Sequence, residues 1–380
     1  MDFDFDDDQK AFRDAVAAAL AGRADHDHVR AMLDDPRGVT DEFWSLAADL
    51  GWTGLLVPQE HGGLGRGMVD AVILLEEAGR VALPGPLFSS AVLATMAARR
   101  LGADDLLADL ASGSARGTVA ITEGSTGDPL GGIATRAERD GADTSATPWR
   151  LTGLKTVVLD GHTADWVIVA AQTPEGLGAF LVTDHGAEHV PGLDPTRKLA
   201  RLVLDGTPAR RLGGNADVTD ILRRVIDDGA VGLAAELVGG MDRALELAVK
   251  YSHDRVQFGR PIGAFQAIRH MAAEMLQKVE LARVGVHYAA WTSDEDTDDR
   301  VSSAALAKSW AAESAVAVTG DCIQIHGAVG FTWDADPHLY YKRAKVNDLL
   351  LGPQGWQRTR VADAVLGAAT PSRPPTPAAA

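Results

Sequence analysis

The chain has 380 residues, of which 46% are hydrophobic and 23% charged. This composition is that of an ordinary folded protein, excludes disordered and fibrous classes, and at roughly 150 residues per domain predicts two or three domains. The net charge of -17 disfavours nucleic acids and anionic membranes as partners. The single cysteine, Cys322, excludes a disulfide framework and cysteine-based metal sites, and the histidine spacing suggests no metal site either.

The first residues, MDFDFDDDQK, form an acidic segment without a basic or an apolar region. A secretory signal is therefore not expected. No apolar run approaches the roughly 18 residues of a membrane-spanning helix. We therefore expect a cytoplasmic protein that does not bind membranes.

Residues 1–115 predict an amino-terminal helical domain. They are rich in alanine and leucine, and apolar residues recur at helical spacing, as at Phe12, Val16 and Leu20. The glycine-rich residues 62–67 interrupt this pattern. They lack the spacing of a dinucleotide-binding loop, so we interpret them as a loop that ends a helix.

Residues 116–208 predict a middle β domain. Short segments rich in β-branched and aromatic residues alternate with Gly, Asp and Pro turns, and no helical pattern separates them. This arrangement favours antiparallel pairing over strand–helix–strand units. The predicted strands span residues 119–122, 149–154, 156–159, 166–171, 179–183 and 201–204.

Residues 217–367 predict a carboxy-terminal four-helix bundle, because long helical stripes follow one another with short connections. The tail at residues 368–380 is rich in proline and has no core residues, so we expect it to be disordered. The fold class is therefore α+β, in the order helices, strands, helices. This order argues against a Rossmann dehydrogenase.

The connection between the first two bundle helices, residues 251–266, is unusually rich in functional residue types. It reads YSHDRVQFGRPIGAFQ and contains two arginines, Arg255 and Arg260. An arginine offers a planar, permanently charged fork to a pyrophosphate, and the glycines allow close approach of the backbone to a ligand. The alternative to a ligand-binding role is that these residues form a turn between two helices, with their arginines in solvent.

This segment resembles the YxxxRxQFGxPIGxFQ motif of the acyl-CoA dehydrogenase family. Further stretches resemble that family in the same order along the chain. They are LGWTGLLVPQEHGG at residues 50–63, AITEGSTGD at 120–128, GLK at 153–155, QIHGAVGF at 324–331 and YKRAK at 341–345. The resemblance covers residues 10 to 360 and implies an α–β–α fold with bound FAD, acting in lipid metabolism.

The resemblance implies a set of FAD-binding residues. Arg255 and Phe258 would meet the pyrophosphate and adenine end of an FAD in a neighbouring subunit, and Gln266, Gln324 and Gly327 would lie near the adenosine. The flavin ring would contact another group, which consists of Ile121, Thr122, Val157, Val158 and Leu159. The implied partners are an acyl-CoA or carrier-bound acyl thioester, an electron acceptor such as electron-transfer flavoprotein, and further subunits in a homo-oligomer or a heterotetramer.

The catalytic base of the family is not found at either of its usual positions. In many members a glutamate lies in a Tyr-Glu-Gly triplet, which is matched here by Leu350, Leu351 and Gly352. In others it lies 26 residues before the FAD arginine, which is Gly229 here, followed by Ala230 in place of an arginine that often meets CoA.

The nearest acids on the same predicted helix are Asp227, Asp228 and Glu236. Asp228 is adjacent to the expected position, and Glu236 lies two turns, roughly 10 Å, further along the same helical face. We take Asp228 and Glu236 as weak candidates for the base, with structural roles as the alternative. The sequence departs from the family's motifs at three further positions. Leu159 replaces a threonine beside the flavin, Asp128 replaces a serine, and Ala328 replaces a glycine.

Three hypotheses remain open at this point. The chain is an FAD-dependent acyl-CoA dehydrogenase with a relocated base, or a non-catalytic subunit that completes the FAD site of a partner, or a flavoprotein of this fold with other acyl-thioester chemistry.

Overall fold

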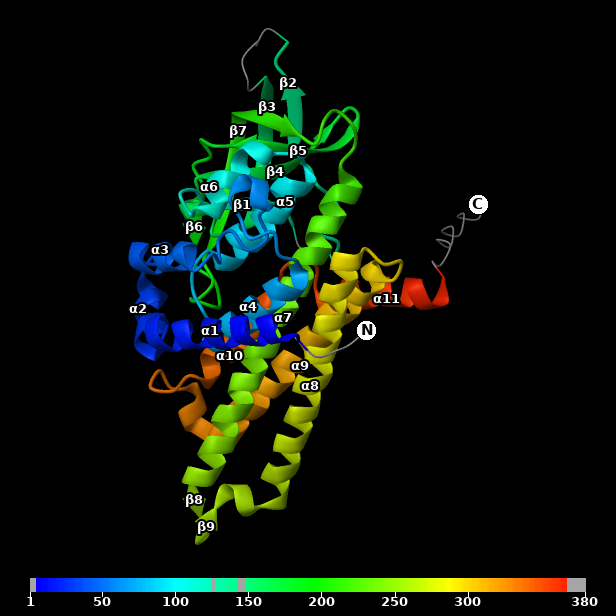
Figure 1. Cartoon of the computed structure of the whole chain (residues 1–380). Coiled ribbons are helices and arrows are strands. Elements are labelled where there is room, and N and C mark those ends of the chain that lie inside the picture. Colours follow the sequence, from blue (N-terminus) through cyan, green and yellow to red (C-terminus); the bar gives the residue numbers. More distant parts are fainter. Residues whose placement is uncertain (1–4, 125–126, 142–147, 368–380) are drawn as a thin grey trace, which may run out of the picture.

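The computed structural model describes residues 5–124, 127–141 and 148–367, so the tail at 368–380 lies outside the described residues. The order of elements is helices, sheet, helices, as the sequence predicts. Figure 1 shows the sheet at one end of an elongated molecule and the tips of the long helices at the other end.

The amino-terminal part is helical because its helices are capped and have buried faces. The side chain of Asp6 accepts a hydrogen bond from the amide of Gln9 at 2.8 Å, and the side chain of Gln9 accepts one from the amide of Asp6, which forms a capping box. Between α4 and α5 lies a π-helical segment, η2 (Leu87–Ala94), which is buried over its whole length. The α-helices are α1 (Asp7–Arg23), α2 (His26–Asp34), α3 (Asp41–Asp49), α4 (Met68–Arg80), α5 (Thr95–Arg100) and α6 (Leu107–Ala111).

The middle part is a β domain, as predicted, but its pairing is mixed rather than wholly antiparallel. The strand order is β1-β4-β2-β3-β7-β5, and β5 also pairs with β4, so the sheet closes on itself. β1 and β2 run parallel to β4, while the pairs β2–β3, β3–β7, β4–β5, β5–β7 and β6–β7 are antiparallel. The strands are β1 (Gly117–Ala120), β2 (Arg136–Arg139), β3 (Trp149–Leu159), β4 (Trp166–Thr173), β5 (Gly176–Val182), β6 (Glu188–Val190) and β7 (Leu199–Leu212).

The carboxy-terminal part is a helical bundle. Helices α7 to α10 pack against one another, and α11 packs against α9. Helix α7 has 36 residues, so at about 1.5 Å per residue it spans about 54 Å and runs from the sheet to the far tip of the molecule. The elements are α7 (Thr219–Asp254), β8 (Val256–Gln257), β9 (Arg260–Pro261), α8 (Gln266–Glu295), α9 (Arg300–His326), α10 (Pro337–Leu349) and α11 (Gln354–Leu366).

A fully buried lysine fixes the end of α10. The ammonium of Lys308, on α9, donates hydrogen bonds to the carbonyl oxygens of Asn347 at 2.7 Å and Asp348 at 3.1 Å. These carbonyls are among those that the end of a helix leaves unpaired. Burial lowers the pKa of Lys308 to about 8, although the charge of Asp348 acts in the opposite direction.

Replacing this lysine by methionine should change how stability depends on pH. The folded pKa of about 8 lies below the ordinary value of 10.5. Between these values the unfolded state binds more protons, so the wild type gains stability as the pH rises through this window. From about pH 7 to pH 10, the free energy of unfolding of the wild type should rise by about 2–3 kcal/mol relative to Lys308→Met. Denaturant unfolding at both pH values measures this change, and a constant difference would contradict it.

Candidate functional site

The hairpin between α7 and α8 presents two of the predicted FAD-binding residues to solvent. Phe258 connects β8 to β9 with a positive φ of 52°, and its side chain is 91% exposed. Arg255 is exposed and makes no ion pair with any described residue, whereas the guanidinium of Arg260 stacks on Phe265 at 4.2 Å. Arg255 is therefore available to an anionic ligand, and Arg260 is held by its own hairpin.

The end of α9 lies beside the end of α7. The rings of Tyr251 and His326 stack with their centroids 4.4 Å apart, which brings Gln324 and Gly327 to the tip that carries the hairpin. Gly327 has a φ of 64°, so glycine is the residue that fits there, while Ala328 is not among the residues with a positive φ. Gln266 is the exposed first residue of α8.

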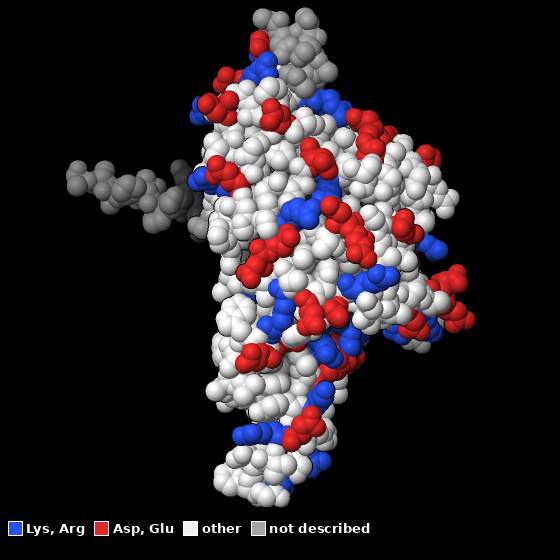
Figure 2. Space-filling view, turned by 90° about the vertical axis from the view of Figure 1, so that its left-hand side faces the viewer, with Lys and Arg blue, Asp and Glu red and all other residues white. Residues whose placement is uncertain are grey.

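This tip also exposes apolar side chains. Val256 is 53% exposed, and Phe331, in the turn after α9, is 67% exposed. Figure 2 shows the lower end of the molecule, where β8 and β9 lie, with uncharged surface interrupted by a few charged side chains. An exposed apolar surface of this kind is typical of a contact with another chain.

The second group of predicted FAD-binding residues lies on the β domain. Thr122 forms a β-bridge with Val157, and Ile121 and Leu159 are buried in the core between the sheet and the helices. Val158 points to the opposite face of β3, into the interior of the closed sheet, so it does not belong to this group.

A buried lysine holds this group in place. The ammonium of Lys155, on β3, donates hydrogen bonds to the carboxylate of Glu123 and to the carbonyl of Ile121, the latter at 3.2 Å. Burial lowers the pKa of Lys155 to about 8 despite the hydrogen bond with Glu123. The sequence identified this lysine only as part of a motif and did not reveal its partner.

The two groups of predicted FAD-binding residues lie far apart in the molecule. The tip group, consisting of Arg255, Phe258, Gln266, Gln324 and Gly327, lies beyond the end of α7 at Asp254. The sheet group, consisting of Ile121, Thr122, Val157 and Leu159, lies where the β domain packs on η2, and η2 in turn touches α7 at Gly229. From Gly229 to Asp254 the helix runs about 38 Å, and this stretch separates the two groups. We therefore expect the two groups of one chain to serve different cofactors.

The two positions that usually carry the catalytic base come together, although they lie far apart in the sequence. A Cβ atom at Gly229 would lie 2.6 Å from Cδ1 of Leu351 and 3.0 Å from Cδ1 of Leu93. The ring of Phe88, from η2, completes this apolar contact. Leu351 has a positive φ of 54°, a conformation that is uncommon for a residue with a side chain. Both base positions are therefore in one place, and apolar side chains surround it.

Glu236 is buried in a charged network rather than in an open pocket. Its carboxylate is paired with Arg197 and accepts a hydrogen bond from the side chain of Asn347 at 3.0 Å. Arg343 lies 4.0 Å away and is also paired with Asp194. This network joins α7 to α10 and to the segment before β7.

Asp228 is likewise buried among partners. Two nitrogens of Arg100 donate to one of its oxygens at 3.0 and 2.7 Å, and the hydroxyl of Ser293 donates to the other at 2.6 Å. Asp227 faces Arg300 and Arg360, and its burial raises its pKa despite the charge of Arg360. Each candidate acid is therefore engaged by at least one guanidinium.

A further contact near the loop at residues 120–128 was not found by sequence reasoning. The carboxylate of Asp128 is paired with Arg223 in a bidentate arrangement, and the guanidinium groups of Arg223 and Arg360 both lie over the ring of Trp356. Burial alone would raise the pKa of Asp128, but the hydrogen bonds from Arg223 and from the amide of Leu130, together with the charges of Arg223 and Arg360, lower it below its ordinary value. No local pattern connects these three distant segments.

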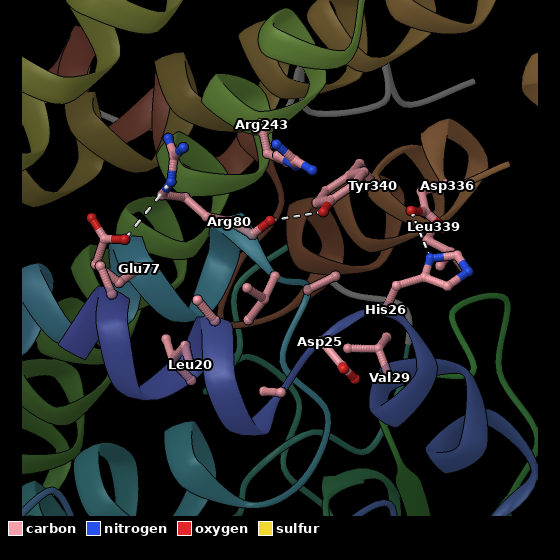
Figure 3. A pocket seen from close by; sticks show the side chains of 15 residues that line it. Leu20, Asp25, His26, Val29, Glu77, Arg80, Arg243, Asp336, Leu339 and Tyr340 are labelled. Atoms are coloured by element: carbon pink, nitrogen blue, oxygen red, sulfur yellow. Dashed lines mark hydrogen bonds and ion pairs between the residues drawn. The ribbon is translucent and has the colours of Figure 1, made fainter.

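A cavity of about 440 Å³ lies outside both groups and outside the base positions. Figure 3 shows it between α1, α2, α4 and α10, where the hydroxyl of Tyr340 donates to the carbonyl of Arg80 and His26 faces Asp336. None of the residues assigned to FAD or to the base lines this cavity. It is therefore not the predicted active site.

The described residues contain neither a metal-binding cluster nor a membrane-spanning helix. Within residues 5–124, 127–141 and 148–367, no three or more His, Cys, Asp and Glu side chains are grouped so that they could hold a metal ion. Over the same part of the chain, no helix combines the length and the apolar character needed to cross a bilayer.

Comparison with known proteins gives the same family at both ends of the chain. Residues 6–118 match the family model described as acyl-CoA dehydrogenase, N-terminal domain, and residues 219–366 match acyl-CoA dehydrogenase, C-terminal domain. A relative from Mycolicibacterium smegmatis, named acyl-CoA dehydrogenase IpdE2, is 33% identical over 357 residues. The alignment covers 93% of this chain and 98% of the relative.

Solved structures agree with this result. The structure of a variant of the Tcur3481-Tcur3483 steroid ACAD has a TM-score of 0.85 and 30% identity, and the match covers 96% of this chain and 99% of that one. The ChsE4-ChsE5 complex from Mycobacterium tuberculosis has a TM-score of 0.86 and 28% identity, covering 98% and 100%. By fold, by motif and by similarity over almost its whole length, the chain belongs to the acyl-CoA dehydrogenase family of oxidoreductases.

Proposed function

We propose that the chain acts in FAD-dependent α,β-dehydrogenation of an acyl-CoA thioester as one subunit of a heteromeric enzyme, in which a partner subunit supplies the catalytic base. The observation that carries this proposal is the contact between Leu351 and Gly229, because it places apolar atoms where the family holds a carboxylate. The candidate replacements, Glu236 and Asp228, are both neutralised by arginine. A carboxylate that is paired in this way is a poor acceptor for a substrate proton.

The residues present fit FAD. At the tip, Arg255 has no acidic partner among the described residues, and Phe258 offers an exposed ring. A guanidinium of this kind suits a pyrophosphate, and an aromatic ring suits an adenine. On the β domain, Thr122 and Val157 are partly exposed beside the buried Ile121 and Leu159, and they would hold one face of the ring system. When bound, FAD would accept the hydride from the β-carbon.

A shared cofactor site supports assembly with another subunit. Because α7 separates the tip group from the sheet group within one chain, each FAD would take its adenine-end contacts from one chain and its flavin-end contacts from another. The structural relative ChsE4-ChsE5 is itself a complex. We propose the same kind of pairing here, with a bulky acyl thioester as the substrate and electron-transfer flavoprotein as the electron acceptor.

Flavin reduction tests the proposal directly. The purified chain is mixed with a panel of acyl-CoA thioesters, alone and after co-expression with a paralogous subunit that carries the glutamate, and the visible flavin band is followed. We expect flavin-containing protein that bleaches only in the co-expressed complex. Complete bleaching of the chain alone would show that it carries its own base and would overturn the heteromer.

Substituting Arg255 tests the tip group. Arg255→Ala should lose a charge-assisted contact worth about 1.5–3 kcal/mol, which corresponds to roughly tenfold to a hundredfold weaker FAD binding. Arg255→Lys should lose less, because it keeps the charge and gives up only the planar fork. Flavin content and FAD titration of both variants measure the effect, and an unchanged alanine variant would reject the role.

A further inference from the structure

Four arginines line a cavity of about 270 Å³ where the amino-terminal helices meet the bundle. Arg66 comes from the loop before α4, Arg99 and Arg100 end α5, and Arg224 belongs to α7. The only acids in the lining are Asp294, near the end of α8, and Asp296, in the α8–α9 connection, so four positive and two negative side chains give a formal charge of +2. The whole chain carries -17, so this local excess of positive charge runs against its composition.

Two of these arginines already have acidic partners. Arg100 donates to Asp228, and Arg224 is paired with Asp296 and also donates to the carbonyl of Ser293 at 2.6 Å. These contacts hold the two guanidinium groups in place along the wall of the cavity.

The other two arginines have no acidic partner. Within the part of the chain that the structure describes, Arg66 and Arg99 make no ion pair, and the only hydrogen bond from Arg99 to an oxygen goes to the carbonyl of Leu56 at 2.8 Å. The nearby Asp294 makes no ion pair with either arginine, and its carboxylate accepts from the amides of Met68 at 2.6 Å and Val69 at 3.0 Å. Most of the N–H groups of Arg66 and Arg99 are thus left to solvent or to a ligand.

We propose that this cavity binds a phosphate-class oxyanion between the two helical parts of the molecule. Guanidinium groups match the oxygens of phosphate through paired N–H donors. The volume lies just below the roughly 300 Å³ at which ordinary small-molecule sites begin, so one phosphoryl group with a small body fits it. None of the residues assigned to FAD lines this cavity, and the site does not depend on the proposed function.

Calorimetric titration of the purified full-length protein with inorganic phosphate, at ionic strength held constant with chloride, tests the site. We expect saturable binding at one site per chain that is at least about tenfold weaker in the double variant Arg66→Ala, Arg99→Ala. The matched control, Arg23→Ala with Arg201→Ala, removes two exposed arginines elsewhere and should bind phosphate as the wild type does. Absence of saturable binding, or equal weakening in both double variants, would overturn the proposal.

Two additions keep the test decisive. If the double alanine variant does not fold, as judged by its circular dichroism, the double variant Arg66→Lys, Arg99→Lys replaces it, because lysine keeps the charge and loses the planar fork. Unchanged phosphate affinity in the lysine variant would also overturn the proposal.

Titration with AMP identifies the source of the phosphate. Binding at least about tenfold tighter than inorganic phosphate assigns the site to a phosphorylated metabolite, and equal or weaker binding assigns it to free phosphate.

Discussion

Leu351→Glu should turn the chain into a protein whose flavin is bleached by acyl-CoA without the paralogous subunit that carries the glutamate. The substitution puts a carboxylate where the side chain now meets Gly229, in an apolar environment that would raise its pKa toward the working pH. A general base typically contributes about 10²–10⁴-fold to the rate, so bleaching should accelerate over the wild type by that order. Stopped-flow recording of the visible flavin band measures it.

Leu351→Gln is the matched control. Glutamine has the same shape and must adopt the same positive φ as leucine and glutamate at this position, but it accepts no proton. The glutamine variant should keep its flavin and react as slowly as the wild type. Equal rates for the two variants would contradict the assignment of this position to the base. Gly229 is the poorer place for the same change, because a side chain there would collide with Leu351 and Leu93.

Glu236→Gln and Asp228→Asn should destabilise the fold instead of abolishing a chemical step. Each change removes the charge of a buried carboxylate and leaves Arg197 or Arg100 without that partner. Breaking the fully buried Glu236–Arg197 pair costs about 3–5 kcal/mol, and the loss for Asp228 is smaller because the Arg100 side chain is 28% exposed. Denaturant unfolding should therefore show a loss of stability for both variants, while the co-expressed complex, where it still assembles, keeps its reactivity per bound flavin.

Glu42→Gln is the control for this pair of variants. Glu42 faces Arg23 at 3.3 Å on the surface, where both side chains are mostly exposed, and such a pair contributes about 1 kcal/mol or less. If Glu236→Gln is as stable as the wild type but no longer bleaches, Glu236 is the base. The proposal of a partner-supplied carboxylate would then fail.

The sequence predicted the layout of the fold well, because periodicity reports which face of an element is buried. The helical stripes and the short β segments correspond to the observed helical and β regions. The pairing of strands was harder to predict. β1 lies parallel to β4, and 45 residues separate the ends of these strands, so no turn between neighbouring strands indicates the direction.

The candidate site shows the same limit at the level of side chains. Glu236 lies among the buried apolar positions of α7, and the sequence left open whether it has a partner. Its partners, Arg197 and Asn347, lie 39 and 111 residues away. The meeting of Leu351 with Gly229 depends in the same way on how α10 and its following turn pack against α7. Such contacts follow from tertiary packing, which local patterns do not contain.

The separation of the tip group from the sheet group along α7 has a consequence for cofactor loading. In the proposed assembly no single folded chain contains a complete FAD-binding site. Retention of FAD therefore depends on the association of two chains, and so on protein concentration. Dilution below the dissociation constant of the subunits would release flavin and separate the chains as one event, and added FAD would favour assembly by mass action. The concentration of FAD would then determine how much of the protein is assembled, as well as how much of the assembled protein is active.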